Sequence, residues 1–220
     1  MITAKPARPR LRRTRVEQSL LEAKVVQISL QLFSDGGGEA VSIRKIASEV
    51  GVPPMSLYRY FPSKAHLVRH IWQDILSRAC EEGKFEAARH RGPMHKLKAF
   101  VRGFLRHWIN HRHHYWFVFC NPAVPCVAGD QHEAEPVRPD PREVLELLSS
   151  MLARCSGSRA PTEAQRHLAE ELFCSALGFL VTTVGLALKT PAEIDGLMER
   201  MLAGMESRIG AALSLCVAAR

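Results

Sequence analysis

Histidine and aromatic residues gather between positions 107 and 116, and two of the histidines have a spacing that suits metal chemistry. His107 and His111 are four residues apart, so on a helix both imidazoles lie on one face, as pairs of metal ligands often do. Cys120 and Cys126 follow closely in the sequence. Arginines interrupt the cluster, however, and no HExxH string accompanies it. We therefore expect no bound metal and interpret these histidines as polar surface or as the lining of a pocket.

The segment 42–64, SIRKIASEVGVPPMSLYRYFPSK, carries basic and aromatic side chains that suit contacts with nucleic acid. Its apolar residues recur at helical spacing up to Val50, and Gly51 is placed to end that helix because glycine tolerates a positive φ. Pro53 and Pro54 can open a second short helix, since the first turn needs no N–H from them. The pattern predicts a helix-turn-helix, whose second helix enters the major groove of DNA.

This segment resembles the DNA-binding domain of the TetR family of bacterial transcriptional regulators. The resemblance rests on five short strings: Ile46-Ala47, Gly51-Val52, Ser56-Leu57-Tyr58, Tyr60-Phe61 and Lys64. It implies an all-α fold, in which an N-terminal three-helix helix-turn-helix domain precedes a larger helical domain for ligand binding and dimerisation. It also implies a function, that of a dimeric repressor released by a small organic ligand from a double-stranded, (pseudo)palindromic DNA operator.

The same resemblance, weighed with side-chain chemistry, assigns the DNA contacts. Arg44 is expected to reach a guanine edge and Lys64 a phosphate, whereas Ser42 acts mainly as a helix cap. Leu57 and Phe61, four residues apart, should face the core. The full predicted set is Ser42, Arg44, Pro54, Met55, Ser56, Tyr58, Arg59, Tyr60 and Lys64.

Positive charge is concentrated in the first third of the chain. Residues 1–70 hold 12 Lys and Arg against 5 Asp and Glu, so they carry +7 of the formal net charge of +8. Such a region gains affinity for a polyanion through counterion release. We expect residues 1–15 to form a basic flexible arm that either orders against DNA or is simply solvated. The helix-turn-helix domain is predicted at 16–62 and the larger domain at 63–220.

Every strongly patterned stretch outside this segment predicts a helix. The first helix should break at the glycines 36–38, and later ones should span about 93–110 and 115–119. Capping boxes are predicted where a capping side chain precedes Glu or Gln by three residues, as in Asp140–Glu143, Thr162–Gln165 and Thr190–Glu193. The proline-rich stretch 121–140 predicts a long surface loop that would gate a binding cavity.

Aromatic and apolar residues of the larger domain predict an effector cavity between helices. The alternative is that they form ordinary hydrophobic core, because aromatic residues at helical spacing do so more often. The predicted pocket set is Phe104, Trp108, His111, Tyr115, Phe119, Met151, Phe173 and Leu177.

The last two long apolar segments, 162–188 and 191–213, predict a homodimer interface. Within the first of them, Leu172–Leu188 carries no charge, but it is shorter than the roughly 20 apolar residues that span a bilayer. We therefore expect no membrane association and instead expect burial against the protein's own core and a second copy. The family resemblance implies the same pairing across a two-fold axis.

Chemistry outside these groups is sparse. The six cysteines show no CxxC spacing and no secretory segment opens the chain, which favours reduced thiols and a cytoplasmic location. No P-loop, Ser-His-Asp arrangement or paired acids were found, so we expect no catalysis and no cofactor. Two other functions stay open: a metal-binding enzyme that uses His107 and His111, and a DNA-binding protein without an effector.

Overall fold

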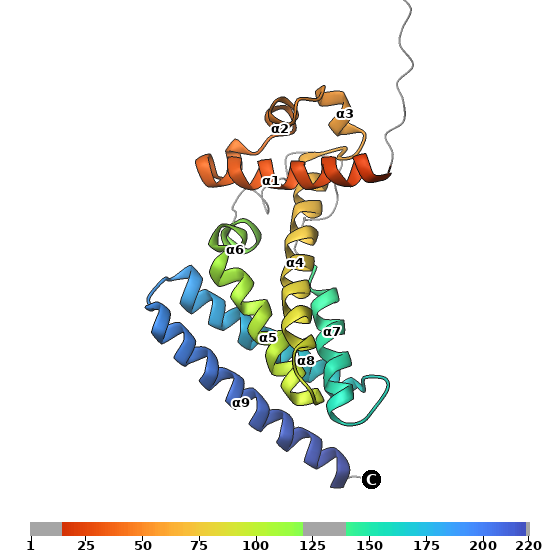
Figure 1. Cartoon of the computed structure of the whole chain (residues 1–220), viewed down its shortest axis with the longest axis vertical. Coiled ribbons are helices and arrows are strands. Elements are labelled where there is room, and N and C mark those ends of the chain that lie inside the picture. Colours follow the sequence, from red (N-terminus) through yellow and green to blue (C-terminus); the bar gives the residue numbers. More distant parts are fainter. Residues whose placement is uncertain (1–14, 121–139, 219–220) are drawn as a thin grey trace, which may run out of the picture. The chain divides into compact units, whose positions relative to one another are not determined.

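The computed structural model describes residues 15–120 and 140–218, and within these ranges every regular element is a helix (Figure 1). The chain divides into two compact units between Ser63 and Lys64. Apart from Arg15 and Asp140, the expected arm 1–15 and the expected loop 121–140 lie outside the described residues. The prediction of an all-α fold, with a helix-turn-helix unit ahead of a larger helical unit, is confirmed.

The first unit contains α1 (Arg15–Ala40), α2 (Ile43–Val50) and α3 (Pro54–Tyr58). The expected break near the end of α1 is present, since Gly36 and Gly37 leave helical geometry, with φ of −150° and 67°. Side chains from all three helices and from Phe61 fill the core. Its buried apolar members include Leu21, Val25, Val26, Leu30, Ile43, Ile46, Ala47, Leu57 and Phe61.

The second unit begins with a long helix that continues the chain from the first unit. Its elements are α4 (Lys64–Ala88), α5 (Pro93–Asn110), α6 (Arg112–Phe119), α7 (Arg142–Cys155), α8 (Glu163–Leu180), η1 (Val181–Gly185) and α9 (Pro191–Ala218). The bounds of α5 agree with the prediction. The next helix, α6, begins three residues before the expected Tyr115, because the His114 N–H already bonds to the His111 carbonyl at 2.9 Å.

Helices α4 and α5 lie side by side (Figure 1), and two glycines let their backbones approach closely. A Cβ on Gly103 of α5 would lie 2.8 Å from the Glu82 carbonyl oxygen and 2.9 Å from Gly83 Cα on α4. Farther along α4, the Trp72 indole N–H donates to the carbonyl of Phe117 on α6 at 3.3 Å. Helices α4 and α5 are therefore packed backbone to backbone, with little room to adjust, and a side-chain hydrogen bond ties α6 to α4.

Two of the three predicted capping boxes are present. Thr162 and Gln165 exchange backbone-to-side-chain bonds of 2.9 and 3.3 Å, and Thr190 and Glu193 do so at 2.8 and 3.4 Å. The third prediction was wrong, because α7 starts at Arg142 and Glu143 is then its second residue rather than its third. The Glu143 carboxylate instead accepts a bond from Ser77 of α4 at 2.9 Å.

The apolar segment 172–188 does not form one uninterrupted α-helix. The α-helix ends at Leu180 and a single π-helical turn, η1, follows, with the Leu186 N–H bonded to the Val181 carbonyl at 2.8 Å. Residues Glu163–Gly185 are long and apolar enough to cross a membrane, with mean hydropathy 1.4 in an 18-residue window that is 44% buried. The core helix of a water-soluble domain has the same composition, so this is weak evidence for a span.

Candidate nucleic-acid interface and ligand sites

Two caps fix the turn between α2 and α3. At the start of α2, the Ser42 hydroxyl accepts the Lys45 N–H at 3.3 Å. At its end, Gly51 adopts the left-handed conformation with φ 80° and ψ 34°. This geometry lets the N–H groups of Gly51 and Val52 both reach the Ala47 carbonyl, at 3.0 and 2.9 Å. The expected roles of Ser42 as a cap and of Gly51 as a helix terminator are confirmed.

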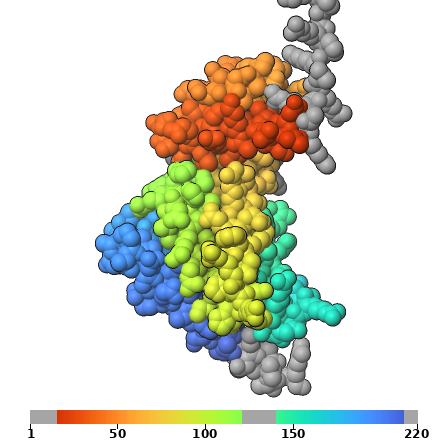
Figure 2. All heavy atoms as spheres, viewed as in Figure 1, coloured from red at the N-terminus to blue at the C-terminus, as the bar shows by residue number. Residues whose placement is uncertain are grey.

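The outer side of α2 and α3 is basic and aromatic, while Leu57 and Phe61 face the core as predicted, at 1% and 4% exposed. In the space-filling view the atoms of α2 and α3, in orange, form one outer face of the first unit (Figure 2). Met55 is 70% exposed and Tyr58 37%. Of the remaining predicted DNA contacts, Arg44, Pro54 and Arg59 are exposed, and Ser42, Ser56 and Tyr60 are half-buried.

Lys64 differs from the other predicted DNA contacts in its position. It is the first residue of α4 and belongs to the second unit, where it is half-buried. Within the first unit, the surface therefore offers two guanidinium groups, two phenols and one apolar side chain. These groups can meet phosphates, base edges and thymine methyls.

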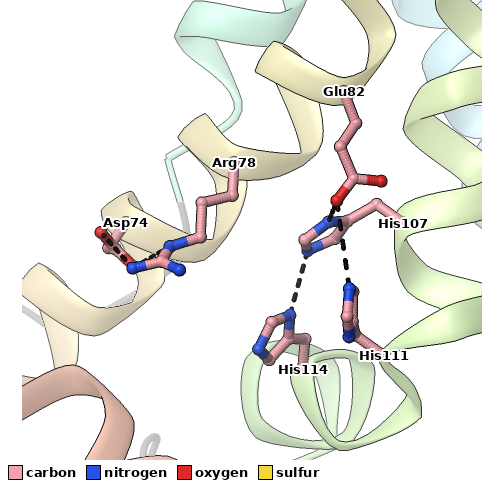
Figure 3. A network of polar contacts seen from close by, with 6 residues as sticks. All are labelled: Asp74, Arg78, Glu82, His107, His111 and His114. Atoms are coloured by element: carbon pink, nitrogen blue, oxygen red, sulfur yellow. Dashed lines mark hydrogen bonds and ion pairs between the residues drawn. The ribbon is translucent and has the colours of Figure 1, made fainter. Parts of the chain in front are cut away.

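The histidine cluster lies where α5 meets α6, and it includes a carboxylate from α4 (Figure 3). His107 is 1% exposed, and its Nδ1 lies 2.7 Å from Glu82 Oε1. Its other ring nitrogen lies 3.0 Å from Nδ1 of His114. His111 Nε2 ends 4.0 Å from the same Glu82 oxygen. The structure thus brings His107 and His111 together as their spacing predicted, and adds Glu82, which the sequence did not indicate.

Burial keeps the imidazoles of His107 and His114 neutral at neutral pH. It lowers the pKa of His107, although the hydrogen bond to Glu82 opposes this shift. Burial, reinforced by neighbouring imidazoles, lowers the pKa of His114 to about 3. A carboxylate only accepts, so the His107 Nδ1–H donates to Glu82 and the His107 Nε2 accepts from His114. The contact with Glu82 is therefore a hydrogen bond between a neutral ring and an anion.

Four of the predicted effector residues form one aromatic cluster. Ring centroids are 5.9 Å apart for Phe104 and Trp108, 5.1 Å for Trp108 and Phe119, and 5.4 Å for Tyr115 and Phe119. Trp108 is fully buried, and its Nε1–H has no hydrogen-bond acceptor among the described residues. Of the other four predicted members, Met151, Phe173 and Leu177 are half-buried on α7 and α8, and His111 belongs to the histidine cluster.

A pocket of about 560 Å³ lies elsewhere in the second unit, and none of the eight predicted effector residues lines it. Three of its side chains are cationic, one is a carboxylate and four are aliphatic. The lining consists of Arg106, Ile109, Asn110, Arg112, Thr183, Val184, Ala187, Lys189, Pro191, Ile194 and Asp195. Sequence reasoning missed this pocket. The signal available in the sequence is the pair of arginines, Arg106 and Arg112, that interrupts the histidine cluster.

The π-turn η1 borders both the pocket and the aromatic cluster. On the pocket side, Val184 contributes to the lining, and the Arg112 guanidinium donates to the Val184 carbonyl at 3.4 Å. On the other side, a Cβ on Gly185 would lie 2.8 Å from the Tyr115 hydroxyl. A displacement of η1 by a bound molecule would therefore reach the aromatic cluster through Tyr115.

Both units match models of known protein families. The family model "Bacterial regulatory proteins, tetR family" matches residues 27–71, and "Tetracyclin repressor-like, C-terminal domain" matches residues 97–205. A solved TetR-family transcriptional regulator from Streptomyces coelicolor superposes with a TM-score of 0.61 at 17% identity, over 86% of this chain and 99% of that one. At that identity the likeness concerns the fold alone.

Two curated relatives carry the description HTH-type transcriptional repressor KstR. The one from Mycolicibacterium smegmatis is 29% identical over 192 residues, which are 84% of this chain and 88% of the relative. The one from Mycobacterium tuberculosis is 29% identical over 146 residues, or 66% of this chain. That match spans 63% of the relative, less than two thirds of its length.

Proposed function

Because this chain belongs to the TetR family of bacterial DNA-binding transcriptional regulators, we propose that it acts as a homodimeric repressor that a small organic ligand releases from its operator. The basic and aromatic outer face of α2 and α3, fixed by the Ser42 and Gly51 caps, carries this proposal. The similarity to proteins described as repressors supports the sign of regulation. Such a protein works in the cytoplasm by binding, without catalysis.

The proposed DNA contacts divide between bases and phosphates. Arg44, exposed near the start of α2, makes a bidentate contact with a guanine, and exposed Met55 packs on a thymine methyl. Tyr58 and Lys64 bind phosphates, which position the protein without reading sequence. The remaining proposed contacts with the duplex are Pro54, Ser56, Arg59 and Tyr60, while Ser42 mainly holds the helix that presents them.

Operator binding tests this division. The operator is first isolated as the fragment of the source genome that the purified protein retains. Arg44→Ala should then weaken operator binding by about 1–3 kcal/mol and relax the preference at one base pair. Lys64→Ala should weaken binding to all sequences alike and reduce the salt slope by about 1. Exposed Arg154 on α7 supplies the control Arg154→Ala. An unchanged affinity and salt slope for Lys64→Ala would contradict the phosphate contact.

The proposed dimer uses residues 162–188 and 191–213. Its supporting observation is a set of apolar side chains that a single chain leaves in water: Val181, Leu186 and Leu188 are 48%, 59% and 69% exposed. A dimer presents two helix-turn-helix units, one for each half-site of an operator. In sedimentation at micromolar concentration, the wild type should be a dimer and Val181→Glu should shift to monomer.

Phe85→Glu is the matched control, because Phe85 is a 65% exposed apolar residue on α4, outside the proposed surface. It should leave the dimer intact. A monomeric wild type at this concentration would contradict the proposed dimer.

The proposed effector is an organic anion with an apolar body. Arg106, Arg112 and Lys189 outnumber the single carboxylate of the pocket, and its aliphatic residues offer apolar surface. The eight residues predicted from the sequence remain part of this proposal as an inner wall, because the aromatic cluster and the pocket meet at η1. Release requires that the effector bind the DNA-free conformation more tightly than the DNA-bound one. A coupling of about 1–3 kcal/mol weakens the operator about 5–150-fold.

A panel of medium-chain fatty acids and aromatic carboxylates provides the test. An active compound should bind free protein more tightly than operator-bound protein, by the same factor as it weakens the operator. Arg112→Gln should weaken that compound's binding, and the control Arg154→Gln should not. Equal calorimetric affinity for free and operator-bound protein would contradict the mechanism.

A further inference from the structure

The Glu82–His107–His111 group brings three metal-ligating atoms from separate positions to one point. Glu82 comes from α4, His107 from the last turn of α5 and His111 from the junction of α5 with α6. One carboxylate oxygen of Glu82 and one ring nitrogen of each histidine all lie within 4.8 Å of one another. Two of the three side chains are half-exposed, at 44% each, so an ion can reach the group from solvent.

The spacing of these atoms suits a tetrahedral transition metal. With metal–nitrogen and metal–oxygen bonds of about 2.0–2.2 Å, ligand atoms lie about 3.4 Å apart. The observed separations from Glu82 Oε1, 2.7 Å to His107 and 4.0 Å to His111, fall on either side of that value. The 4.0 Å separation is too long for a hydrogen bond, so His111 points at the carboxylate without bonding to it. Small movements of the exposed Glu82 and His111 side chains are enough to equalise both separations.

The surroundings of the group can accommodate an ion in place of the His107–Glu82 hydrogen bond. The metal-free protein carries the His107 proton on Nδ1, but the 3.0 Å contact between His107 Nε2 and His114 Nδ1 also allows the opposite arrangement, in which the His107 Nε2–H donates to His114. That bond leaves the His107 Nδ1 lone pair directed at Glu82, as a metal ligand requires. Arg78 of α4 is engaged elsewhere, since its guanidinium is bonded to Asp74 at 2.6 Å (Figure 3).

We propose that Glu82, His107 and His111 form a binding site for a divalent transition metal ion of the zinc class, with solvent at the fourth position. Two imidazole nitrogens and one carboxylate oxygen are ligands typical of Zn²⁺. The ion displaces the His107 Nδ1 proton to solvent. His114 passes its Nδ1 proton to His107 Nε2 and takes one from solvent at its own Nε2, so both rings stay neutral and the His107 Nε2–H donates to His114 Nδ1. The ion links α4, which follows the helix-turn-helix in sequence, to the α5–α6 junction.

Zn²⁺ binding to the untagged full-length chain tests the site directly. After treatment with a chelator, calorimetric titration should show one equivalent of Zn²⁺ bound with a Kd in the micromolar range or below. His111→Ala and Glu82→Gln should each weaken binding at least about tenfold, since loss of even an outer partner of a metal site has that effect. His113→Ala is the matched control, because His113 is exposed in the same helix and outside the group.

Wild-type thermal stability should rise with Zn²⁺ and the two ligand variants should lose most of that rise, since an ion that binds only the folded state stabilises it. Circular dichroism without metal checks that both variants are folded. The site is overturned if the wild type binds no Zn²⁺ in this range, if Glu82→Gln leaves the affinity unchanged, or if His113→Ala weakens binding as much as His111→Ala. None of these measurements involves DNA, so a negative result for the metal site leaves the proposed repressor function untouched, and the reverse also holds.

Discussion

Replacing Gly103 with alanine should push α4 and α5 apart. The new Cβ would lie 2.8 Å from the Glu82 carbonyl oxygen, 2.9 Å from Gly83 Cα and 3.1 Å from the Glu82 carbonyl carbon. All three atoms belong to the α4 backbone, so no side chain can rotate out of the way. The helices must separate locally, and the contacts of buried neighbours such as Phe100 and Phe104 are lost with that separation.

Two opposing effects set the magnitude. Overpacking a tight site destabilises by about 1–3 kcal/mol, and a clash with rigid backbone belongs in the upper part of that range. Alanine in a helix interior is favoured over glycine by about 0.5–1 kcal/mol. The net destabilisation is about 1–2 kcal/mol. For a protein of this size, that lowers Tm by about 2–8 °C.

Thermal unfolding followed by far-ultraviolet circular dichroism measures the change. Gly204→Ala is the matched control, because Gly204 lies inside α9 and, among the described residues, no atom beyond its own helix backbone lies within 4 Å of its added Cβ. Within one chain this variant should show only the gain in helix propensity, and sedimentation checks that the dimer is unchanged, because Gly204 lies in the proposed dimer segment 191–213. If Gly103→Ala raised Tm as much as Gly204→Ala, the close approach of α4 and α5 would be refuted. Because Gly103→Ala also displaces Glu82, it should lower the Zn²⁺ affinity as well as Tm.

Three further perturbations test the local chemistry. Ser42→Ala should lower the free energy of unfolding by about 1 kcal/mol, because it removes the hydrogen bond to the Lys45 N–H; an unchanged denaturant midpoint would show that the cap contributes nothing. Gly51→Val should destabilise more strongly, since a β-branched residue is strained at φ 80°, and operator affinity should fall with it. Burial raises the pKa of the Cys80 thiol to about 12, so peptide mapping after mild alkylation at pH 8 should find Cys80 unmodified and exposed Cys120, which lies outside the proposed dimer segments, modified; rapid alkylation of Cys80 in folded protein would contradict its burial.

The helix-turn-helix was predictable because its determinants are local in sequence. Ser42 and Gly51 act on backbone groups within five residues of themselves, so residue type and spacing were enough to assign their roles. The break at Gly36 and Gly37 and the start of α5 at Pro93 follow from the same local rules. The box predicted at Asp140 failed over a shift of one residue, which is the usual uncertainty of a helix start.

The ligand sites depend on contacts between helices, and for that reason the sequence indicated only parts of them. His107 and His111 share one helix face, but their third partner, Glu82, lies 25 residues before His107 on another helix. The pocket combines Arg106 and Arg112 with residues of η1 and α9, more than 70 positions farther along the chain. No periodicity links such positions, because their proximity arises from packing.

If the proposed effector reaches the aromatic cluster, the buried indole N–H of Trp108, which has no acceptor among the described residues, discriminates between bound guests of equal shape. A buried donor without an acceptor destabilises the protein by about 1–3 kcal/mol. A guest that places a carbonyl or ether oxygen against Nε1 removes this penalty, whereas a pure hydrocarbon leaves it in place. The oxygenated guest would therefore bind about 5–150-fold more tightly than its hydrocarbon counterpart. Trp108→Phe, which keeps an aromatic ring and deletes the donor, should abolish that preference.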